Sequence, residues 1–366
     1  MERYYFDHNA TTPVAPAVID TLLPLLRDGF GNASSIHQPG QQAKQALERA
    51  RRQTARFLGC APKEIIFTSG GTEADNLAIL GVRGHIVTSN IEHPAILAAC
   101  RELDVTFVPA DARGMIQPDE VRAAIRPETA LVSIMHANNE LGVVQDIAAL
   151  AEIAHQAGAL FHSDGVQAAG KINLDLSGID MYTISGHKLN APKGIGALYV
   201  KQGVEIHARQ FGGRHELGRR AGTENVPGAV ALGAAVELER DVDRIAALTR
   251  RLETFIVSRV PGAVVNAGDS PRVPNTTNIR FAGIEGESMV IALDLRGFAV
   301  SSGAACSSGA VEPSHVLMAI GLTREQAKSS IRFSLGLGNT EEQVDALVEA
   351  VVSSAAHLRR LSPVYA

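Results

Sequence analysis

Three short polar segments contain the residue types that a phosphate-bearing cofactor needs. The first, "TSGGTEADN" (residues 68–76), runs from a predicted strand through a glycine turn into a predicted helix. A helix N-terminus presents free backbone N–H groups and the positive end of the helix dipole. With the hydroxyls of Ser69 and Thr72, this turn suits a phosphate, although by itself it is an ordinary strand-to-helix turn. It matches neither the dinucleotide-binding fingerprint nor the P-loop.

The other two segments contribute a carboxylate and a lysine. "HSDGVQ" (residues 162–167) places Asp164 at the end of an apolar strand, and "SGHKLNAPKG" (residues 185–194) places Lys188 after another. Alone, Asp164 is typical of a helix N-cap and Lys188 of an exposed loop. Together with a phosphate turn, they are the three protein groups that pyridoxal phosphate requires. The carboxylate keeps the pyridine nitrogen protonated, and a part-buried lysine can form a Schiff base.

A fourth segment, "SSGAACSSGA" (residues 301–310), carries a single thiol among serine, glycine and alanine. Because such residues offer few packing contacts, we expect this segment to be poorly ordered in a structure without a sulfur acceptor. One interpretation is a flexible loop that happens to contain Cys306; the other is a nucleophilic thiol that must travel. Cys60 and Cys100 lie on helix-like patterns, and we interpret both as packing residues.

The elements that must position these groups follow an alternating pattern. Short apolar runs that resemble strands are separated by helical patterns, which predicts an α/β domain with a mainly parallel sheet. The predicted strands are "EIIFTS", "HIVTS", "VTFVPA", "LVSIMH", "ALFHSD", "MYTIS" and "GALYV". Polar residues gather where five of these strands end. Since ligands of such sheets bind beyond the carboxyl ends of the strands, we expect these residues to form one site.

The pattern changes after about residue 225. Residues 227–259 predict one or two long helices, and strand-like "NTTNIRFAG" and "IRFSLG" flank a helix at "GESMVIALDL"; a final amphipathic helix follows. This order predicts a second, smaller α+β domain. There are no repeats or low-complexity linkers, so we expect the two domains to pack closely.

Composition excludes several classes of protein. The 366 residues are 45% apolar and 20% charged, which is typical of a soluble globular protein. A net charge of −5 provides no overall electrostatic attraction to nucleic acid or to an anionic membrane. Three scattered cysteines predict neither a disulfide scaffold nor a metal site. The N-terminus lacks a signal-peptide pattern, and no apolar run reaches the roughly 18 residues of a membrane span. We therefore expect a cytoplasmic protein.

Long ordered motifs also carry a family resemblance. They include "DHNATTP", "FGNASSIH", "EIIFTSGGTEADNLAI", "EHPAIL", "VSIMHANNELGVVQDI", "HSDGVQAAGK", "SGHKLNAPKGIGALYV", "GGRHELGRRAGTENV", "SSGAACSSGAVEPSHVL" and "SSIRFSLG". Through them the chain resembles the cysteine desulfurases of the class V, fold-type I pyridoxal-phosphate family, in the subgroup that serves nitrogen fixation and iron–sulfur cluster assembly. The resemblance extends over nearly the whole chain.

The resemblance implies a role for each site residue. Lys188 would form the Schiff base, Asp164 would pair with the pyridine nitrogen, and Gln167 would contact the phenolic oxygen. His93 would stack on the ring and exchange a proton with the Cys306 thiol. The implied phosphate ligands are Gly71, through its backbone, Thr72, Ser185, His187 and, reaching across to the neighbouring subunit of a homodimer, Thr223. Asn139 and Arg332 would bind the substrate carboxylate, because the arginine fork matches a carboxylate.

The resemblance also implies the fold and the reaction. It predicts a large domain (residues 13–250) with a seven-stranded sheet, and a small domain (residues 1–12 and 251–366) that carries the cysteine loop. L-cysteine would become L-alanine, with its sulfur transferred to Cys306 as a persulfide for an acceptor such as an iron–sulfur scaffold. Two alternatives remain open: a selenocysteine lyase or class V aminotransferase with the same fold, and a catalytically silent dimeric binding protein.

Overall fold

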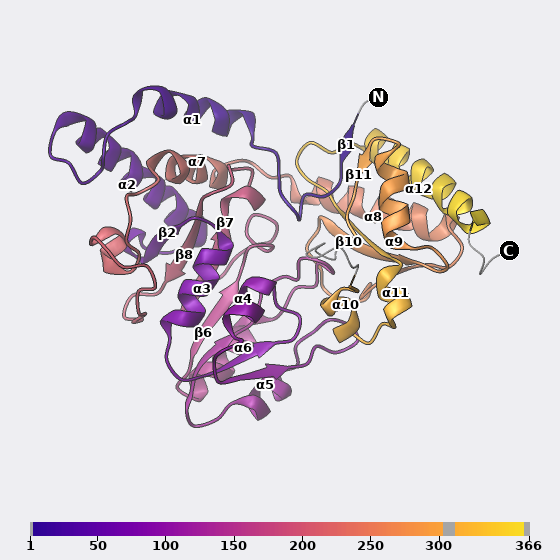
Figure 1. The fold of residues 1–366 in the computed structure, drawn as a ribbon, viewed down its shortest axis with the longest axis horizontal. Coiled ribbons are helices and arrows are strands. Elements are labelled where there is room, and N and C mark those ends of the chain that lie inside the picture. Colours follow the sequence, from indigo (N-terminus) through magenta and orange to yellow (C-terminus); the bar gives the residue numbers. More distant parts are fainter. Residues whose placement is uncertain (1–2, 303–311, 362–366) are drawn as a thin grey trace.

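A seven-stranded sheet forms the centre of the larger part of the molecule (Figure 1). The computed structural model describes residues 3–302 and 312–361. The strand order is β2-β8-β7-β6-β5-β3-β4, and β8 alone runs antiparallel to its neighbours, which confirms the predicted mainly parallel sheet. The strands are β2 (Ile65–Thr68), β3 (His85–Ser89), β4 (Val105–Val108), β5 (Thr129–Ser133), β6 (Leu160–Asp164), β7 (Met181–Ser185) and β8 (Gly196–Val200).

Helices cover both faces of this sheet, so its strands are apolar on both sides. In β2, Ile65 and Phe67 pack into one hydrophobic cluster, which includes residues of α2, α6 and α7, whereas Ile66 packs into another with α3. This period of two, with both faces buried, explains why the strands appear as continuous apolar runs. The helices of this part are α1 (Pro16–Asp28), α2 (Gln38–Leu58), α3 (Gly71–Gly81), α4 (Pro94–Ala99), α5 (Pro118–Ala124), α6 (Ile147–Gln156) and α7 (Val226–Val236).

A smaller unit with its own core lies beside the large sheet (Figure 1). Its antiparallel sheet has the order β12-β10-β9, and the N-terminal strand β1 pairs in parallel with β11. Its elements are β1 (Tyr4–Tyr5), α8 (Val242–Arg259), β9 (Ala263–Val265), β10 (Thr276–Phe281), α9 (Gly286–Asp294), β11 (Phe298–Ala299), β12 (Ser330–Ser334) and α12 (Glu341–Leu361). Two separate parts of the sequence form the core of this unit: Phe6 near the N-terminus, and residues from Ile245 onward. We propose that the domain division follows this core, close to residue 13 and at the start of α8, near Asp241 rather than at the predicted residue 250.

The N-terminal motif "DHNATTP" runs between the two units. Asp7 forms a bridge with Ser334 of β12, whereas the Thr12 amide donates to the His187 carbonyl at 2.8 Å, on the turn after β7. Segments that are far apart in the sequence therefore meet at the carboxyl ends of the large sheet. Within the described residues, no helix is both long and apolar enough to cross a membrane.

Candidate active site

A cavity of about 360 Å³ opens at the carboxyl ends of the large sheet. Its volume lies within the range of small-molecule sites. The residues that line it are Asn9, Ala10, Gly71, Thr72, Asp75, His93, Met135, Ala137, Asn139, Asp164, Val166, Gln167, Ser185, His187, Lys188 and Arg332. Among the described residues, all but two of the site residues predicted from the sequence are therefore brought together here. The two exceptions are Ser69 and Thr223, which line a neighbouring cavity. Cys306 lies outside the described residues.

Lys188 ends the short 3-10 turn Gly186–Lys188 that follows β7. Its ammonium group donates to the carbonyl of Ala10 at 2.7 Å and to the carbonyl of Asn9. Burial, together with the charge of Arg332, lowers the pKa of Lys188 to about 8. A substantial fraction of this amine is thus neutral near physiological pH, which is the form that acts as a nucleophile or a base.

Asp164 is the last residue of β6 and is 6% exposed. Its Oδ1 accepts from the Val166 amide at 2.9 Å. Burial raises the pKa of the Asp164 carboxyl, and the nearby His93 and Lys188 oppose that shift. A buried carboxylate gains most from a cationic partner, so this position suits a protonated ring nitrogen.

The first turn of α3 lies at one end of the cavity, and its free N–H groups suit an anion. α3 begins at Gly71, so its first N–H groups have no partner within the helix and line the cavity beside Thr72 and Ser185. Glycines allow the surrounding backbone to approach closely: a Cβ on Gly196 of β8 would lie 2.7 Å from Gly70. This turn therefore depends on a strand neighbour without a side chain.

Two histidines near this end are neutral bases. Burial lowers the pKa of His187 to about 4, and its Nδ1 lies 3.2 Å from the Thr11 hydroxyl. Burial also lowers the pKa of His93. His93 caps α4, where its Nδ1 accepts from the Ala95 amide at 3.1 Å. Because Nδ1 is an acceptor there, the proton of the neutral His93 ring is on Nε2.

Arg332, from β12 of the small unit, and Asn139, from the loop after β5 of the large unit, lie together on one side of the cavity. Arg332 is on β12, is 5% exposed, and donates to Asp7 Oδ1 at 2.7 Å and to the Asn139 carbonyl at 2.9 Å. Its Nε is buried and has no hydrogen-bond partner among the described residues. Buried donors normally have partners. The unpaired Nε therefore marks a position for an anionic ligand.

Sequence reasoning missed two polar residues of this cavity, Asp75 and Asn9. Asp75 lies three positions after Thr72 on α3, and this helical spacing on one face is the signal that could have identified it. It is 1% exposed, and burial together with the neighbouring Asp164 raises its pKa well above the usual range. Asn9 belongs to the quoted motif "DHNATTP", but no local pattern indicated that this segment reaches Lys188.

Thr223 lines a separate cavity of about 240 Å³, together with Ser69 and Arg220. It does not line the cavity of its own chain that contains Lys188. Arg220 forms an ion pair with Glu73, whose Oε2 accepts from the Ser69 amide at 2.7 Å. Thr223 therefore lies on the outer side of the phosphate turn.

Cys306 lies outside the described residues, so the structure does not test the expectation that its segment is poorly ordered. The chain on either side of the gap is attached next to the substrate side of the cavity. Ser301 exchanges backbone hydrogen bonds with Arg332 (2.7 and 3.3 Å), and the Ser314 hydroxyl donates to Glu140, the neighbour of Asn139. Both flanks therefore start from residues adjacent to the predicted carboxylate site.

Comparisons with known proteins point to one family. The model of the class V aminotransferases matches residues 4–347. A cysteine desulfurase of Gluconacetobacter diazotrophicus is 47% identical, covering 99% of this chain and 96% of its own. The cysteine desulfurase IscS of Dictyoglomus turgidum is 43% identical, covering 98% and 96%. Among solved structures, a NifS-like protein from Rickettsia africae matches with a TM-score of 0.90 and 34% identity over 97% of this chain and 100% of that chain. SspA in complex with cysteine matches with a TM-score of 0.82 and 37% identity, covering 90% and 98%.

Proposed function

Since the chain belongs to the class V aminotransferase family and is a pyridoxal-phosphate-dependent cysteine desulfurase, we propose that the cavity around Lys188 is its active site and that Cys306 receives the sulfur. One observation carries this proposal. A single cavity is lined by the lysine and carboxylate that suit the cofactor and by the arginine that suits a substrate carboxylate, namely Lys188, Asp164 and Arg332.

The residues present fit the cofactor. Asp164 would face the pyridine nitrogen, Gln167 the phenolic oxygen, and His93 the ring. The first turn of α3, with Thr72, would hold the phosphate, along with Ser185 and His187. When bound, pyridoxal phosphate withdraws electrons from the substrate's Cα. Lys188, with its lowered pKa, moves the proton at that carbon.

Arg332 and Asn139 would hold the substrate carboxylate. Asp7 and the Asn139 carbonyl already orient the guanidinium, and its Nε has no hydrogen-bond partner among the described residues. The thiolate of Cys306 then attacks the substrate Sγ. An S–S bond forms, the Cβ–Sγ bond breaks, and its electron pair remains on the substrate. Protonation of that carbon gives alanine. The IscS names of two relatives support an iron–sulfur scaffold as the acceptor. The proposed cytoplasmic setting rests on the composition of the sequence alone.

The direct test of this function is turnover of L-cysteine by the holoenzyme with a thiol reductant. We expect alanine and sulfide in equal amounts. Arg332→Gln should lower kcat/KM roughly ten- to hundredfold, because a hydrogen bond to a charged group is worth about 1.5–3 kcal/mol. Arg324→Gln, on an exposed arginine, is the matched control and should leave kcat/KM unchanged.

Two results would contradict this function. Amino transfer to a keto acid without sulfide would identify a class V aminotransferase. Turnover of L-selenocysteine but not of L-cysteine would identify a selenocysteine lyase. An unaltered kcat/KM in the Arg332→Gln variant would remove Arg332 from the substrate site while leaving the reaction class intact.

We further propose a homodimer in which Thr223 of one subunit contacts the cofactor phosphate of the other. Large apolar side chains are exposed on α1, on the chain that follows it, and on the loop that precedes Thr223. They are Leu23, Leu26, Phe30, Ile36, Phe211 and Leu217, and Phe30 and Phe211 are each 85% exposed. Apolar surface of this extent is typical of a protein interface. Thr223 itself lies outside its own chain's cavity, which suits a role in the partner's.

Replacing Phe30 with aspartate should weaken this dimer. A buried charge at an interface hot spot costs at least about 2 kcal/mol, so we expect roughly thirtyfold weaker association and weaker retention of the cofactor. Sedimentation across a dilution series measures the association. Leu295→Asp, on a 73% exposed leucine of the smaller unit, is the control. A Phe30→Asp protein that stays dimeric with normal cofactor retention would disprove this interface.

A further inference from the structure

Lys171 is a second part-buried lysine beside the active site, and the function above gives it no role. It belongs to the segment "HSDGVQAAGK", which begins in β6 and continues into the turn after it. Backbone hydrogen bonds from Ala168 and Ala169 to the Gly165 carbonyl form a helical turn there. Residues four apart on such a turn lie on the same face. Lys171 therefore lies next to Gln167, which lines the cavity.

The Lys171 amine donates two hydrogen bonds to side-chain oxygens. One goes to Gln167 Oε1 at 2.5 Å and the other to Asn9 Oδ1 at 2.8 Å. Gln167 Nε2 in turn donates to the Asn9 carbonyl at 2.9 Å, the same carbonyl that receives Lys188. Lys171, Gln167 and Asn9 thus contact one another in a ring, and the Asn9 carbonyl connects this ring to Lys188.

No carboxylate balances the charge of Lys171: none of the ion pairs between described residues includes it. Its amine is enclosed, and burial, with the charges of Lys188 and Arg332, lowers the pKa of Lys171 well below the usual value. A neutral amine still has two hydrogens, which match the two oxygen acceptors. Lys171 therefore acts in this structure as a hydrogen-bond donor rather than as a salt-bridge partner.

These contacts determine which way the Gln167 amide faces. With Oε1 held by Lys171, the group that Gln167 can offer to a ligand is Nε2, which has a second hydrogen beyond the one given to Asn9. If the amide were reversed, its oxygen would face the Asn9 carbonyl, and two acceptors would meet without a hydrogen between them. The Asn9 carbonyl therefore opposes that arrangement, and the hydrogen bond from Lys171 to Oε1 stabilises the observed one.

We propose that Lys171 is a positioning residue that fixes Gln167 as a hydrogen-bond donor toward the cofactor's phenolic oxygen and holds the Asn9 carbonyl in place for Lys188. This inference rests on the proposed location of the cofactor. A donor at the phenolic oxygen would stabilise the negative charge of that oxygen. The proton that the oxygen would share with the nitrogen of Lys188 would then be held less tightly, so its pKa would be lower.

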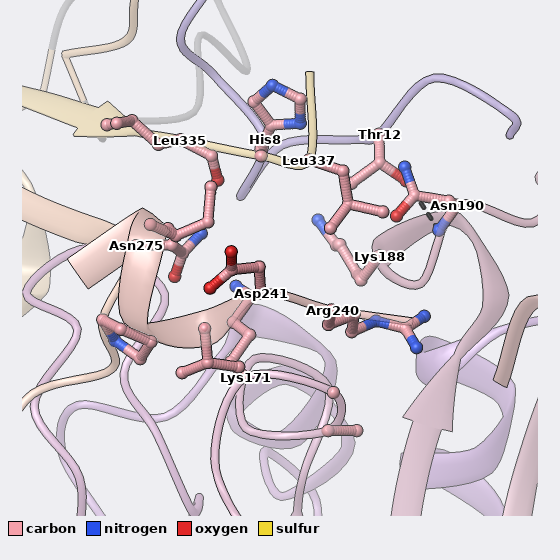
Figure 2. A pocket seen from close by; sticks show the side chains of 16 residues that line it. His8, Thr12, Lys171, Lys188, Asn190, Arg240, Asp241, Asn275, Leu335 and Leu337 are labelled. Atoms are coloured by element: carbon pink, nitrogen blue, oxygen red, sulfur yellow. Dashed lines mark hydrogen bonds between the residues drawn. The ribbon is translucent and has the colours of Figure 1, made fainter. Parts of the chain in front are cut away.

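The small cavity on the other side of Lys188 offers no competing role for Lys171. Figure 2 shows Lys171 and Lys188 among the side chains that line it, with Asn275 and Leu335. It encloses about 60 Å³, far less than a small-molecule site requires. It is a gap between the two units rather than a second ligand site.

The test compares Lys171→Met with wild type by the pH titration of the bound cofactor's visible absorbance. We expect the titration midpoint to rise by about one pH unit, because the freed amide no longer presents a fixed donor. The cofactor should also be lost about tenfold faster on dilution. Lys171→Arg keeps a donor and should stay closer to wild type. Lys63→Met, on an exposed lysine, is the control, and melting temperatures show that each variant is folded.

A double-mutant cycle shows whether Lys171 acts through Gln167. In the Gln167→Ala background, Lys171→Met should cause no further shift of the midpoint, because coupled residues are non-additive. An equal shift in both backgrounds would overturn the inference. So would a normal midpoint in Lys171→Met when Gln167→Ala alone shifts it. If Gln167→Ala shifts nothing, the proposed placement of the cofactor against Gln167 fails, and this inference with it.

Discussion

Replacing Lys188 with alanine is expected to abolish covalent attachment of pyridoxal phosphate and to lower desulfuration by roughly a thousandfold or more. Among the residues that line the cavity, Lys188 is the only lysine. Its removal takes away both the group that attaches the cofactor and the base at the substrate Cα. The visible absorbance of the purified protein and the peptide mass after borohydride reduction measure attachment directly.

The pH dependence of attachment supplies an independent check on Lys188. Burial and Arg332 lower the pKa of this amine to about 8, and only its neutral form is a nucleophile. The rate at which the cofactor-free wild-type protein binds pyridoxal phosphate covalently should therefore fall about tenfold per unit as the pH drops below about 8. Lys193→Ala, on the exposed neighbouring lysine, should behave as wild type. Borohydride-trapped cofactor on any other lysine would refute the assignment.

Replacing Cys306 with alanine is expected to abolish sulfide release while the cofactor and L-cysteine still bind. The loss should be at least roughly a thousandfold, because removing a catalytic nucleophile can cost about a millionfold in kcat. The reason is that Lys188, Asp164 and Arg332 remain, so the steps before sulfur transfer are intact. Steady-state sulfide release, together with the change in cofactor absorbance on adding cysteine, separates binding from transfer.

The other two cysteines serve as controls for this result. Burial raises the pKa of Cys60 to about 12 and that of Cys100 to about 11, so neither forms a thiolate at neutral pH. Cys60→Ala and Cys100→Ala should therefore release sulfide at the normal rate. If Cys306→Ala is as active as they are, the sulfur leaves without passing through this thiol.

The large sheet and most of the cavity were predictable because they follow local patterns. Each strand of the seven-stranded sheet is an apolar run, and five of the seven predicted strands end in polar residues. Parallel strands bring their carboxyl ends to one edge, so the convergence of Asp164 and Lys188 required no knowledge of side-chain positions. The glycine turn before α3 was also predictable from a local pattern, because two glycines separate a strand pattern from a helix pattern there.

The contacts between distant segments were not predictable from local patterns. Asp7 and Arg332 are 325 positions apart, yet they form an ion pair in the cavity wall. Asn9 likewise connects Lys171, Lys188 and the Asn139 carbonyl. Such contacts depend on how the small unit packs on the large one, and hydrophobic periodicity holds no information about that packing. The role of Thr223 came from the family resemblance alone. For Cys306, the residues left two interpretations open, and the resemblance favoured the nucleophilic thiol.

The central claim is that sulfur from L-cysteine moves to Cys306 in the cavity that contains Lys188. The most direct measurement is the mass of the peptide containing Cys306 after one turnover with L-cysteine and no reductant. In wild-type protein, we predict a gain of one sulfur atom on Cys306, reversed by a thiol reductant, and none in Lys188→Ala. An unmodified Cys306 after alanine has formed, or the extra sulfur on Cys60 or Cys100 instead, would contradict the account.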